Sequence, residues 1–157
     1  MEPDMELTLA ARAENIAIVR HALGGLGEAF AVPEQKLSDV RLAVTEACAN
    51  VVVHAYPEGQ EGPMEVVASM RDGSLTVLVR DWGRGIGPRP DSPGLGLGLS
   101  LMAALAEQLQ LEHNDKEHTE VRMTFVLPDS LPGVDVSTDT GVAPAVSPQP
   151  RMNGDRA

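Results

Sequence analysis

Two segments joined by Asp72-Gly73 constrain the fold of this chain more than any other feature. Residues 64–70 and 74–80 are both rich in the β-branched and apolar residues that are typical of strands. Asp-Gly is a preferred pair at the tip of a two-residue hairpin, because that turn requires a positive φ at both positions. The sequence therefore predicts an antiparallel hairpin, against which the other segments have to fit.

The remaining apolar patterns predict a strand and two helices before the hairpin, and a helix and two strands after it. Apolar residues at spacings of three and four indicate a helix over about 16–30, and Pro33 suits the first turn of a second helix that runs to about Ala55. The other expected elements are strands over 5–10, 109–113 and 119–127 and a helix over 97–109. This order predicts an α+β fold in which the helices cover one face of a mixed, largely antiparallel sheet.

The composition changes after Pro128. Residues 129–157 are rich in Pro, Gly, Ser and Thr and contain no aromatic residue, and neither a helix nor a central strand tolerates the closely spaced prolines of residues 143–150. We therefore expect a folded domain over residues 1–128 and a disordered tail over 129–157. The whole chain has two Phe, one Tyr and one Trp, so the core is expected to be mainly aliphatic.

The net charge restricts the classes of ligand and partner. The chain has 12 Lys and Arg residues against 23 Asp and Glu residues, which gives a formal net charge of −11 and argues against direct binding of nucleic acid. Lys36 and Lys116 are its only lysines, which excludes a polybasic membrane patch, and no run of 18 apolar residues is present to span a membrane. Without a targeting segment, a cytoplasmic protein is expected.

Three polar side chains recur every four residues on the expected second helix, away from its apolar face. Glu46, Asn50 and His54 therefore line one side of that helix. A carboxamide oxygen suits Mg²⁺ as a neutral ligand, and a carboxylate one turn earlier can accept a proton from a nearby hydroxyl or water. Taken alone, this spacing is more often the solvated side of an amphipathic helix. The apolar face consists of Leu37, Val40, Val44, Ala47, Cys48 and Val51.

A carboxylate followed by alternating glycines ends the second strand of the hairpin. Gly83 and Gly85 allow the backbone to approach a planar ligand, from which Asp81 can accept a hydrogen bond. The exocyclic amine of adenine is such a donor. The simpler interpretation is a glycine-rich turn closed by an Asx-type hydrogen bond.

A second glycine-rich segment leads directly into the expected third helix. Gly94, Gly96 and Gly98 permit tight backbone turns, and the free N–H groups at the start of a helix attract phosphate. The spacing matches neither the dinucleotide-binding fingerprint nor the P-loop. A flexible connector explains this segment equally well when it is considered by itself.

Taken in their order along the chain, these motifs resemble the ATP-binding domain of the GHKL superfamily, which includes gyrases, histidine kinases and MutL. Residues 46–56 resemble its N box, and residues 81–86 and 94–102 resemble its two glycine boxes. Glu-Ala-x-x-Asn followed by His-Ala-Tyr is similar to the small anti-sigma-factor serine kinases of the RsbW and SpoIIAB type. The resemblance implies a Bergerat-type two-layer sandwich.

The resemblance also implies a role for each matching residue. Asn50 would coordinate the Mg²⁺ that bridges the phosphates of ATP, and Glu46 would be the general base. Asp81 would bind the adenine amine, with support from Thr119 on the last strand. The glycines would shape the floor of the adenine pocket (Gly83 and Gly85) and wrap the phosphates (Gly94, Gly96 and Gly98).

The same resemblance implies the partners. The phosphoryl acceptor would be a serine of a STAS-type anti-anti-sigma factor, and the competing partner would be a sigma factor held inactive by a homodimer of the kinase. Two alternatives remain at this point. One is a module that binds ATP without transferring phosphate, and the other is a detached catalytic domain of a histidine kinase.

Other conspicuous residues have simpler interpretations. His113 and His118 flank an expected turn, where a solvated hairpin is favoured over a zinc site. Cys48 belongs to the apolar face of the second helix, which favours a buried thiol over a nucleophile. Because Cys48 is the only cysteine, the chain forms no intramolecular disulfide framework.

Overall fold

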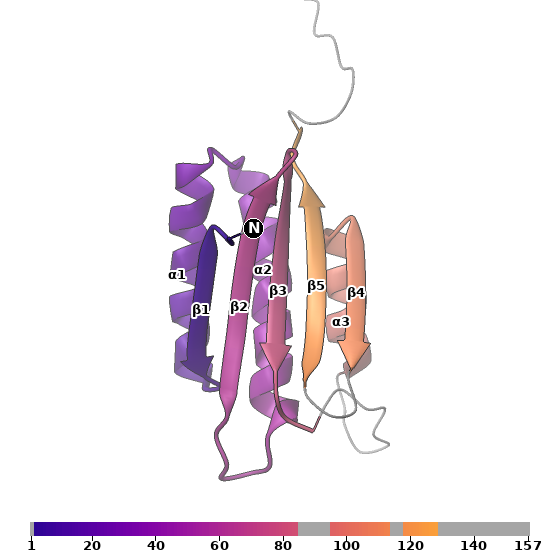
Figure 1. Cartoon of the computed structure of the whole chain (residues 1–157). Helices are drawn as coiled ribbons and strands as arrows, with labels where there is room; N and C mark the ends of the chain where they lie inside the picture. Colours follow the sequence, from indigo (N-terminus) through magenta and orange to yellow (C-terminus); the bar gives the residue numbers. More distant parts are fainter. Residues whose placement is uncertain (1, 85–94, 114–117, 129–157) are drawn as a thin grey trace, which may run out of the picture.

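The fold consists of a sheet and a layer of helices, as a computed structural model of residues 2–84, 95–113 and 118–128 shows (Figure 1). The five strands are β1 (Met5–Ala10), β2 (Pro63–Arg71), β3 (Ser74–Asp81), β4 (Gln108–His113) and β5 (Thr119–Val126). The helices are α1 (Ala13–Ala29), α2 (Glu34–Asn50), the π-helix η1 (Val51–Ala55) and α3 (Leu95–Leu105). The residues of the expected tail, 129–157, lie outside the described part. None of the described helices is long and apolar enough to cross a membrane.

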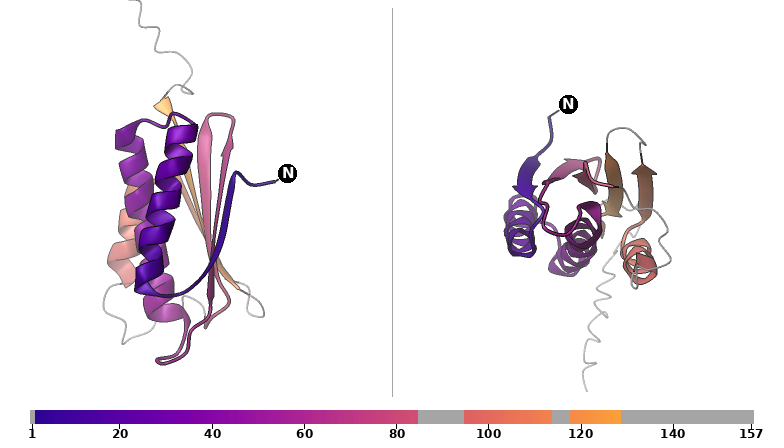
Figure 2. Two further views of the ribbon diagram at one scale, coloured as in Figure 1. Left: turned by 90° about the vertical axis from the view of Figure 1, so that its left-hand side faces the viewer. Right: turned by 90° about the horizontal axis from the view of Figure 1, so that it is seen from below.

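The strands form one sheet in the order β1-β2-β3-β5-β4, and α1, α2 and α3 all lie on the same face of it (Figure 2). This arrangement confirms the predicted α+β fold with helices on one face. Each described pairing of strands is antiparallel, so the described sheet has no parallel pair where the sequence had left room for a mixed sheet.

The predicted hairpin is the centre of the sheet. Pairing of β2 with β3 runs from Met64 opposite Asp81 to Arg71 opposite Ser74. Asp72 and Gly73 at its tip have φ values of 48° and 68°, as a turn of this type requires. The turn thus fixes the register, which decides the face on which each side chain of β3 lies, including that of Asp81.

The inner face of the sheet and the helices enclose an aliphatic core. Val66, Val77 and Met123 are fully buried there, and Phe125 is the one fully buried aromatic side chain of the described residues. The apolar face predicted for α2 is confirmed, because all six of its residues are buried. Burial raises the pKa of the Cys48 thiol to about 12, so this thiol stays protonated and unreactive at neutral pH.

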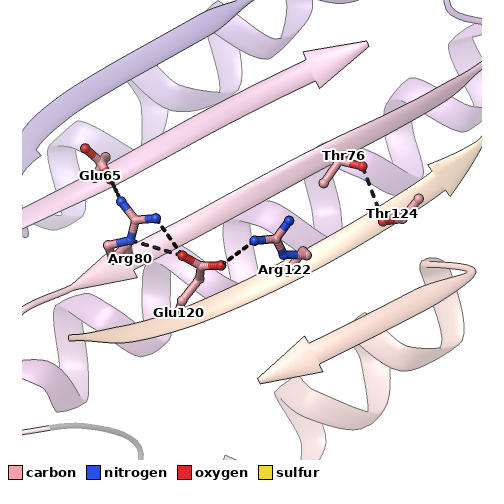
Figure 3. Close-up of polar contacts among 6 residues, drawn as sticks. All are labelled: Glu65, Thr76, Arg80, Glu120, Arg122 and Thr124. Atoms are coloured by element: carbon pink, nitrogen blue, oxygen red, sulfur yellow. Dashed lines mark hydrogen bonds and ion pairs between the residues drawn. The ribbon is translucent and has the colours of Figure 1, made fainter. Parts of the chain in front are cut away.

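The outer face of the sheet carries a network of charged side chains (Figure 3). Arg80 donates to Glu120 from Nε at 3.1 Å and from Nη2 at 2.6 Å, and it also contacts Glu65. Arg122 donates to the other oxygen of Glu120 at 3.0 Å. Burial by itself raises the pKa of Glu120, but the hydrogen bonds from the two arginines outweigh it and lower the pKa. Three strands are thereby linked across a face that no described helix covers.

Two helices differ from the prediction at their C-terminal ends. The second helix spans the expected residues, but its last turn, Val51–Ala55, is a π-helix, which the helical period of the sequence did not predict. The third helix ends at Leu105 instead of Leu109, since the backbone of Leu109 pairs with Met123 in the sheet. A short apolar run does not distinguish a buried helix from a strand.

The close contact between α1 and α2 leads to a testable prediction about the stability of the fold. A methyl group on Gly27 would lie 2.6 and 2.7 Å from the two Cδ atoms of buried Leu37, whereas a methyl group on Gly25 would meet no atom within 4 Å. We expect Gly27→Ala to lower the free energy of unfolding by about 1–3 kcal/mol through overpacking. Gly25→Ala should raise it by up to about 1 kcal/mol through helix propensity. Urea unfolding of both variants checks this, and equal stabilities would contradict the described helix packing.

Candidate functional site

Asp81 and Thr119 lie side by side at one end of the sheet. Asp81 is the last residue of β3, and the strand register places it opposite Thr119, the first residue of β5. Both side chains are on the inner face and are 2% and 1% exposed. A buried carboxylate and a buried hydroxyl are therefore adjacent where two central strands meet the helical layer.

The backbone that follows Asp81 runs against the end of η1. Gly83 donates its N–H to Asp81 Oδ1 at 2.9 Å, and Arg84 donates its N–H to the carbonyl of Ala55 at 2.7 Å. A Cβ atom on Gly83 would lie 2.0 Å from that carbonyl oxygen, so only glycine permits this approach. The Asx-type bond considered from the sequence is present, and it holds a carboxylate that is itself buried.

Burial raises the pKa of the Asp81 carboxyl. The hydrogen bond from Gly83 and the nearby charges of His113 and His118 lower the pKa in part, but the net direction is upward. The protein therefore offsets only part of the free-energy cost of burying the charged form of Asp81. A further hydrogen-bond donor at this carboxylate would stabilise the charged form.

His113 extends this pair to a third strand. The register of β4 and β5 places His113 opposite Thr119, and the ring Nδ1 lies 2.9 Å from the Thr119 hydroxyl oxygen. His113 is exposed, as expected for a hairpin residue, but the sequence did not indicate its contact with Thr119. Its position at the end of one predicted strand, with Thr119 at the start of the next, is the signal from which this pairing could have been predicted.

Glu46 and Asn50 form a second polar group, on α2. Glu46 is half-buried, and Asn50 is 9% exposed although its side chain is polar. The amide nitrogen of Asn50 is buried and has no hydrogen-bond partner among the described residues. Such groups are rare in proteins and are usually satisfied by water, an ion or a ligand.

The start of α3 lies against this second group. A Cβ atom on Gly98 would be 3.3 Å from Glu46 Oε2 and 3.5 and 3.6 Å from the two terminal atoms of Asn50. The backbone of α3 therefore lies close to the carboxylate and the carboxamide at this point, and the glycine places no side chain between them. The structure brings together two motifs that the sequence had placed apart, the pair Glu46 and Asn50 and the glycine-rich segment that contains Gly98.

The other predicted site residues are divided between the described and undescribed parts of the chain. Gly96 lies in the first turn of α3, and His54 lies in η1, one turn beyond Asn50. Gly85 and Gly94 fall outside the described residues. Within the described ranges there is no group of three or more His, Cys, Asp or Glu side chains that could hold a metal ion.

Comparison with known proteins identifies the family of this chain. Residues 9–125 match the family described as the histidine kinase-like ATPase domain. The chain is similar to the serine-protein kinase RsbW of Bacillus thuringiensis (strain Al Hakam), with 30% identity over 126 residues, which cover 71% of this chain and 78% of the relative. It is also similar to the anti-sigma F factor of Clostridium botulinum (strain Eklund 17B / Type B), with 28% identity over 133 residues, which cover 78% and 93% of the two chains.

A solved structure supports the fold. The crystal structure of the RsbU and RsbW domains of a protein from Mycobacterium tuberculosis matches with a TM-score of 0.65 and 23% identity. The match covers 81% of this chain, and this chain spans 33% of that longer chain.

The raised pKa of Asp81 predicts how stability depends on pH. A carboxyl group that is harder to ionise in the folded state than in the unfolded state favours folding below its unfolded pKa, near 3.8, and this contribution is lost as the pH rises through the folded value. We expect Asp81→Asn to remove this loss, so that the variant gains stability relative to the wild type as the pH rises above about 4.

Urea unfolding from pH 3 to pH 8 measures the effect. Asp72→Asn is the matched control, because Asp72 is exposed in the hairpin turn and asparagine also tolerates its positive φ. A difference between Asp81→Asn and the wild type that does not vary with pH would contradict the prediction.

Proposed function

Because the chain belongs to the histidine kinase-like ATPase domain family, we propose that it binds ATP with Mg²⁺ and transfers the γ-phosphoryl group to a serine of a protein partner. The observation that carries the proposal is the meeting of Glu46, Asn50 and Gly98 at the start of α3. It joins a proton acceptor, a neutral oxygen ligand and a helix N-terminus, which are the groups that phosphoryl transfer uses.

Asp81 and Thr119 form the base-binding side of the proposed site. The Asp81 carboxylate accepts a hydrogen bond from the exocyclic amine of adenine, and Thr119 supports the same side of the ring. Burial of Asp81 and the upward direction of its pKa support this role, since an amine donor stabilises the charged carboxylate where water does not reach it. Gly83 and Gly85 shape the floor of this pocket in the proposal.

Asn50 and the glycines before and within α3 form the phosphate side. Asn50 provides one oxygen ligand to Mg²⁺, whose charge, when the ion is bound, offsets the negative charge of the phosphate oxygens. The buried, unpartnered N–H group of the Asn50 amide fits a phosphate oxygen as its acceptor, and the glycine at position 98 places no side chain beside Glu46 and Asn50. Gly94, Gly96 and Gly98 bring backbone N–H groups close to the phosphate chain.

Glu46 is the proposed general base. The serine hydroxyl oxygen bonds to the γ-phosphorus while the bond from that phosphorus to the β–γ bridging oxygen breaks, and ADP leaves. The hydroxyl proton passes to the Glu46 carboxylate. Its half-buried position beside Asn50 and Gly98 keeps the carboxylate close to the phosphate side and accessible to an incoming hydroxyl.

The names of the relatives support the choice of partner. One is called a serine-protein kinase and another an anti-sigma factor. We place the acceptor serine on a STAS-type anti-anti-sigma factor, and we propose that a homodimer of this chain sequesters a sigma factor in the cytoplasm. The net charge of −11 suits a basic protein partner. We assign these activities to the domain over residues 1–128, followed by a disordered tail over 129–157.

The role of Glu46 makes the first functional prediction. In a mixture with labelled ATP, Mg²⁺ and the candidate STAS partners of the organism, the wild type should transfer label to a partner serine. Glu46→Gln removes the proton acceptor and should slow transfer by about a hundredfold or more, while ATP still binds. Single-turnover transfer and equilibrium binding of ATP measure the two effects separately.

Glu34→Gln is the matched control, because Glu34 lies at the start of the same helix with a side chain that is 82% exposed. It should transfer label at the wild-type rate. Tight binding of ATP by the wild type without transfer to any STAS partner would contradict the kinase proposal and favour a binding module.

The role of Asn50 makes a second prediction. Asn50→Ala removes the oxygen ligand and should weaken ATP binding in the presence of Mg²⁺ by about tenfold or more, with a smaller effect in EDTA. Calorimetric titrations under both conditions measure this, and Gln35→Ala, which removes an exposed carboxamide from the same helix, is the control. Normal binding of MgATP by Asn50→Ala would show that the metal assignment is wrong.

A further inference from the structure

The hydroxyl group of Tyr56 lies between the ends of two strands. The register of β2 and β3 pairs Met64 with Asp81, so the next rung of the ladder would pair Pro63 with Trp82. Instead, Trp82 donates its N–H to the Tyr56 hydroxyl oxygen at 3.1 Å, and that hydroxyl donates to the carbonyl of Pro63 at 2.6 Å. A side-chain hydroxyl thus takes the place of a direct backbone hydrogen bond.

This contact belongs to a set that fixes residues 82–84, directly after Asp81. Three consecutive N–H groups each have a different acceptor: Trp82 uses the Tyr56 hydroxyl, Gly83 uses Asp81 Oδ1, and Arg84 uses the Ala55 carbonyl. Two of these acceptors come from the chain that leaves the helical layer at η1. The direction in which the Asp81 carboxylate points is therefore tied to the end of that helix.

The ring of Tyr56 packs directly against the backbone of Gly62. A Cβ atom on Gly62 would lie 2.1 and 2.2 Å from ring atoms of Tyr56, so the absence of a side chain there admits the ring. Burial raises the pKa of the Tyr56 phenol. The group therefore remains protonated at neutral pH and able to donate to Pro63.

We propose that Tyr56 is a positioning residue for Asp81, whose hydroxyl holds the strand end at the distance at which the carboxylate meets a 6-amino group on a purine. This inference rests on the proposed function, because it needs a nucleotide at the site. It goes beyond that function by assigning base selectivity to a residue that does not touch the base. Without the hydroxyl, the Trp82 N–H and the Pro63 carbonyl bond to each other or to water, and the segment that carries Asp81 moves.

The test compares two nucleotides that differ in one group. ATP carries the 6-amino group, and purine riboside triphosphate lacks it. Tyr56→Phe keeps the ring against Gly62 and removes the hydroxyl. We expect this variant to bind ATP about tenfold more weakly than the wild type and to bind the analogue equally well, because only the amine meets Asp81. The ratio of the two dissociation constants does not depend on the fraction of folded protein.

Thr76→Val is the matched control, since it also removes a hydroxyl from a side-chain hydrogen bond, that to Thr124 on the outer face of β3 (Figure 3). It should leave the ratio unchanged. If Tyr56→Phe weakens the binding of both nucleotides by the same factor, Tyr56 supports the fold and the positioning role is wrong, while the proposed function stands. If the wild type binds both nucleotides equally well, the base assignment of Asp81 fails, and the role of Tyr56 fails with it.

A second measurement leaves the fold unchanged. Tyr56 is the only tyrosine of the chain, so growth on 3-fluorotyrosine gives one ¹⁹F resonance. Saturation with ATP should shift this resonance, and saturation with purine riboside triphosphate should shift it less. A resonance that ATP binding leaves in place would overturn the proposal, because a hydroxyl that aims Asp81 has to respond when Asp81 acquires a partner.

Discussion

Both halves of the site depend on one close approach of the backbone between the helical layer and the sheet. At the end of η1 the Ala55 carbonyl meets the backbone of Gly83 and Arg84, at a distance that no side chain on residue 83 would permit. Glu46 and Asn50 lie on the helix that leads to this contact, and Asp81 lies at the end of the strand that runs into it from the sheet. Because both segments are fixed at one point, the position of Asp81 relative to Glu46 and Asn50 is fixed as well. A site whose residues come from both a helix and a sheet requires a fixed contact between the two, and here this is the contact of Ala55 with Gly83 and Arg84.

Local patterns predicted the parts of the fold that local chemistry determines. The Asp72-Gly73 turn and the apolar face of α2 follow from turn preference and helical period, and both are confirmed. The end of α3 was predicted wrongly, since pairing of Gln108 and Leu109 with β5, the next strand along the chain, decides it. The roles of Glu46, Asn50 and Asp81 remain predictions. Their grouping around Gly98 and Thr119 depends on the packing of α3 and on sheet register, which no single segment of the sequence contains.

The negative net charge of the chain limits how the proposed site can bind the phosphates of ATP. A protein with a formal charge of −11 and two lysines has little positive field with which to attract a nucleotide. The positive charges on the outer face of the sheet are already paired, as Arg80 and Arg122 are with Glu120. Affinity for a phosphate chain would therefore come from a bound cation and from backbone dipoles at the start of α3. Binding of ATP would then depend more on Mg²⁺ than in a site with a lysine.

The π-helical turn after Asn50 determines how many residues separate Asn50 from the contact of Ala55 with Gly83 and Arg84. A π-turn holds one residue more than an α-turn, so it acts as a one-residue insertion within a helix. Removing one residue from Val51–Ala55 would rotate everything that follows by about 100° and draw it back by about 1.5 Å. Ala55 and Tyr56 would then face away from the strand end. Substitutions along this turn therefore leave the position of Ala55 and Tyr56 along the helix unchanged, whereas a change in the length of the turn does not.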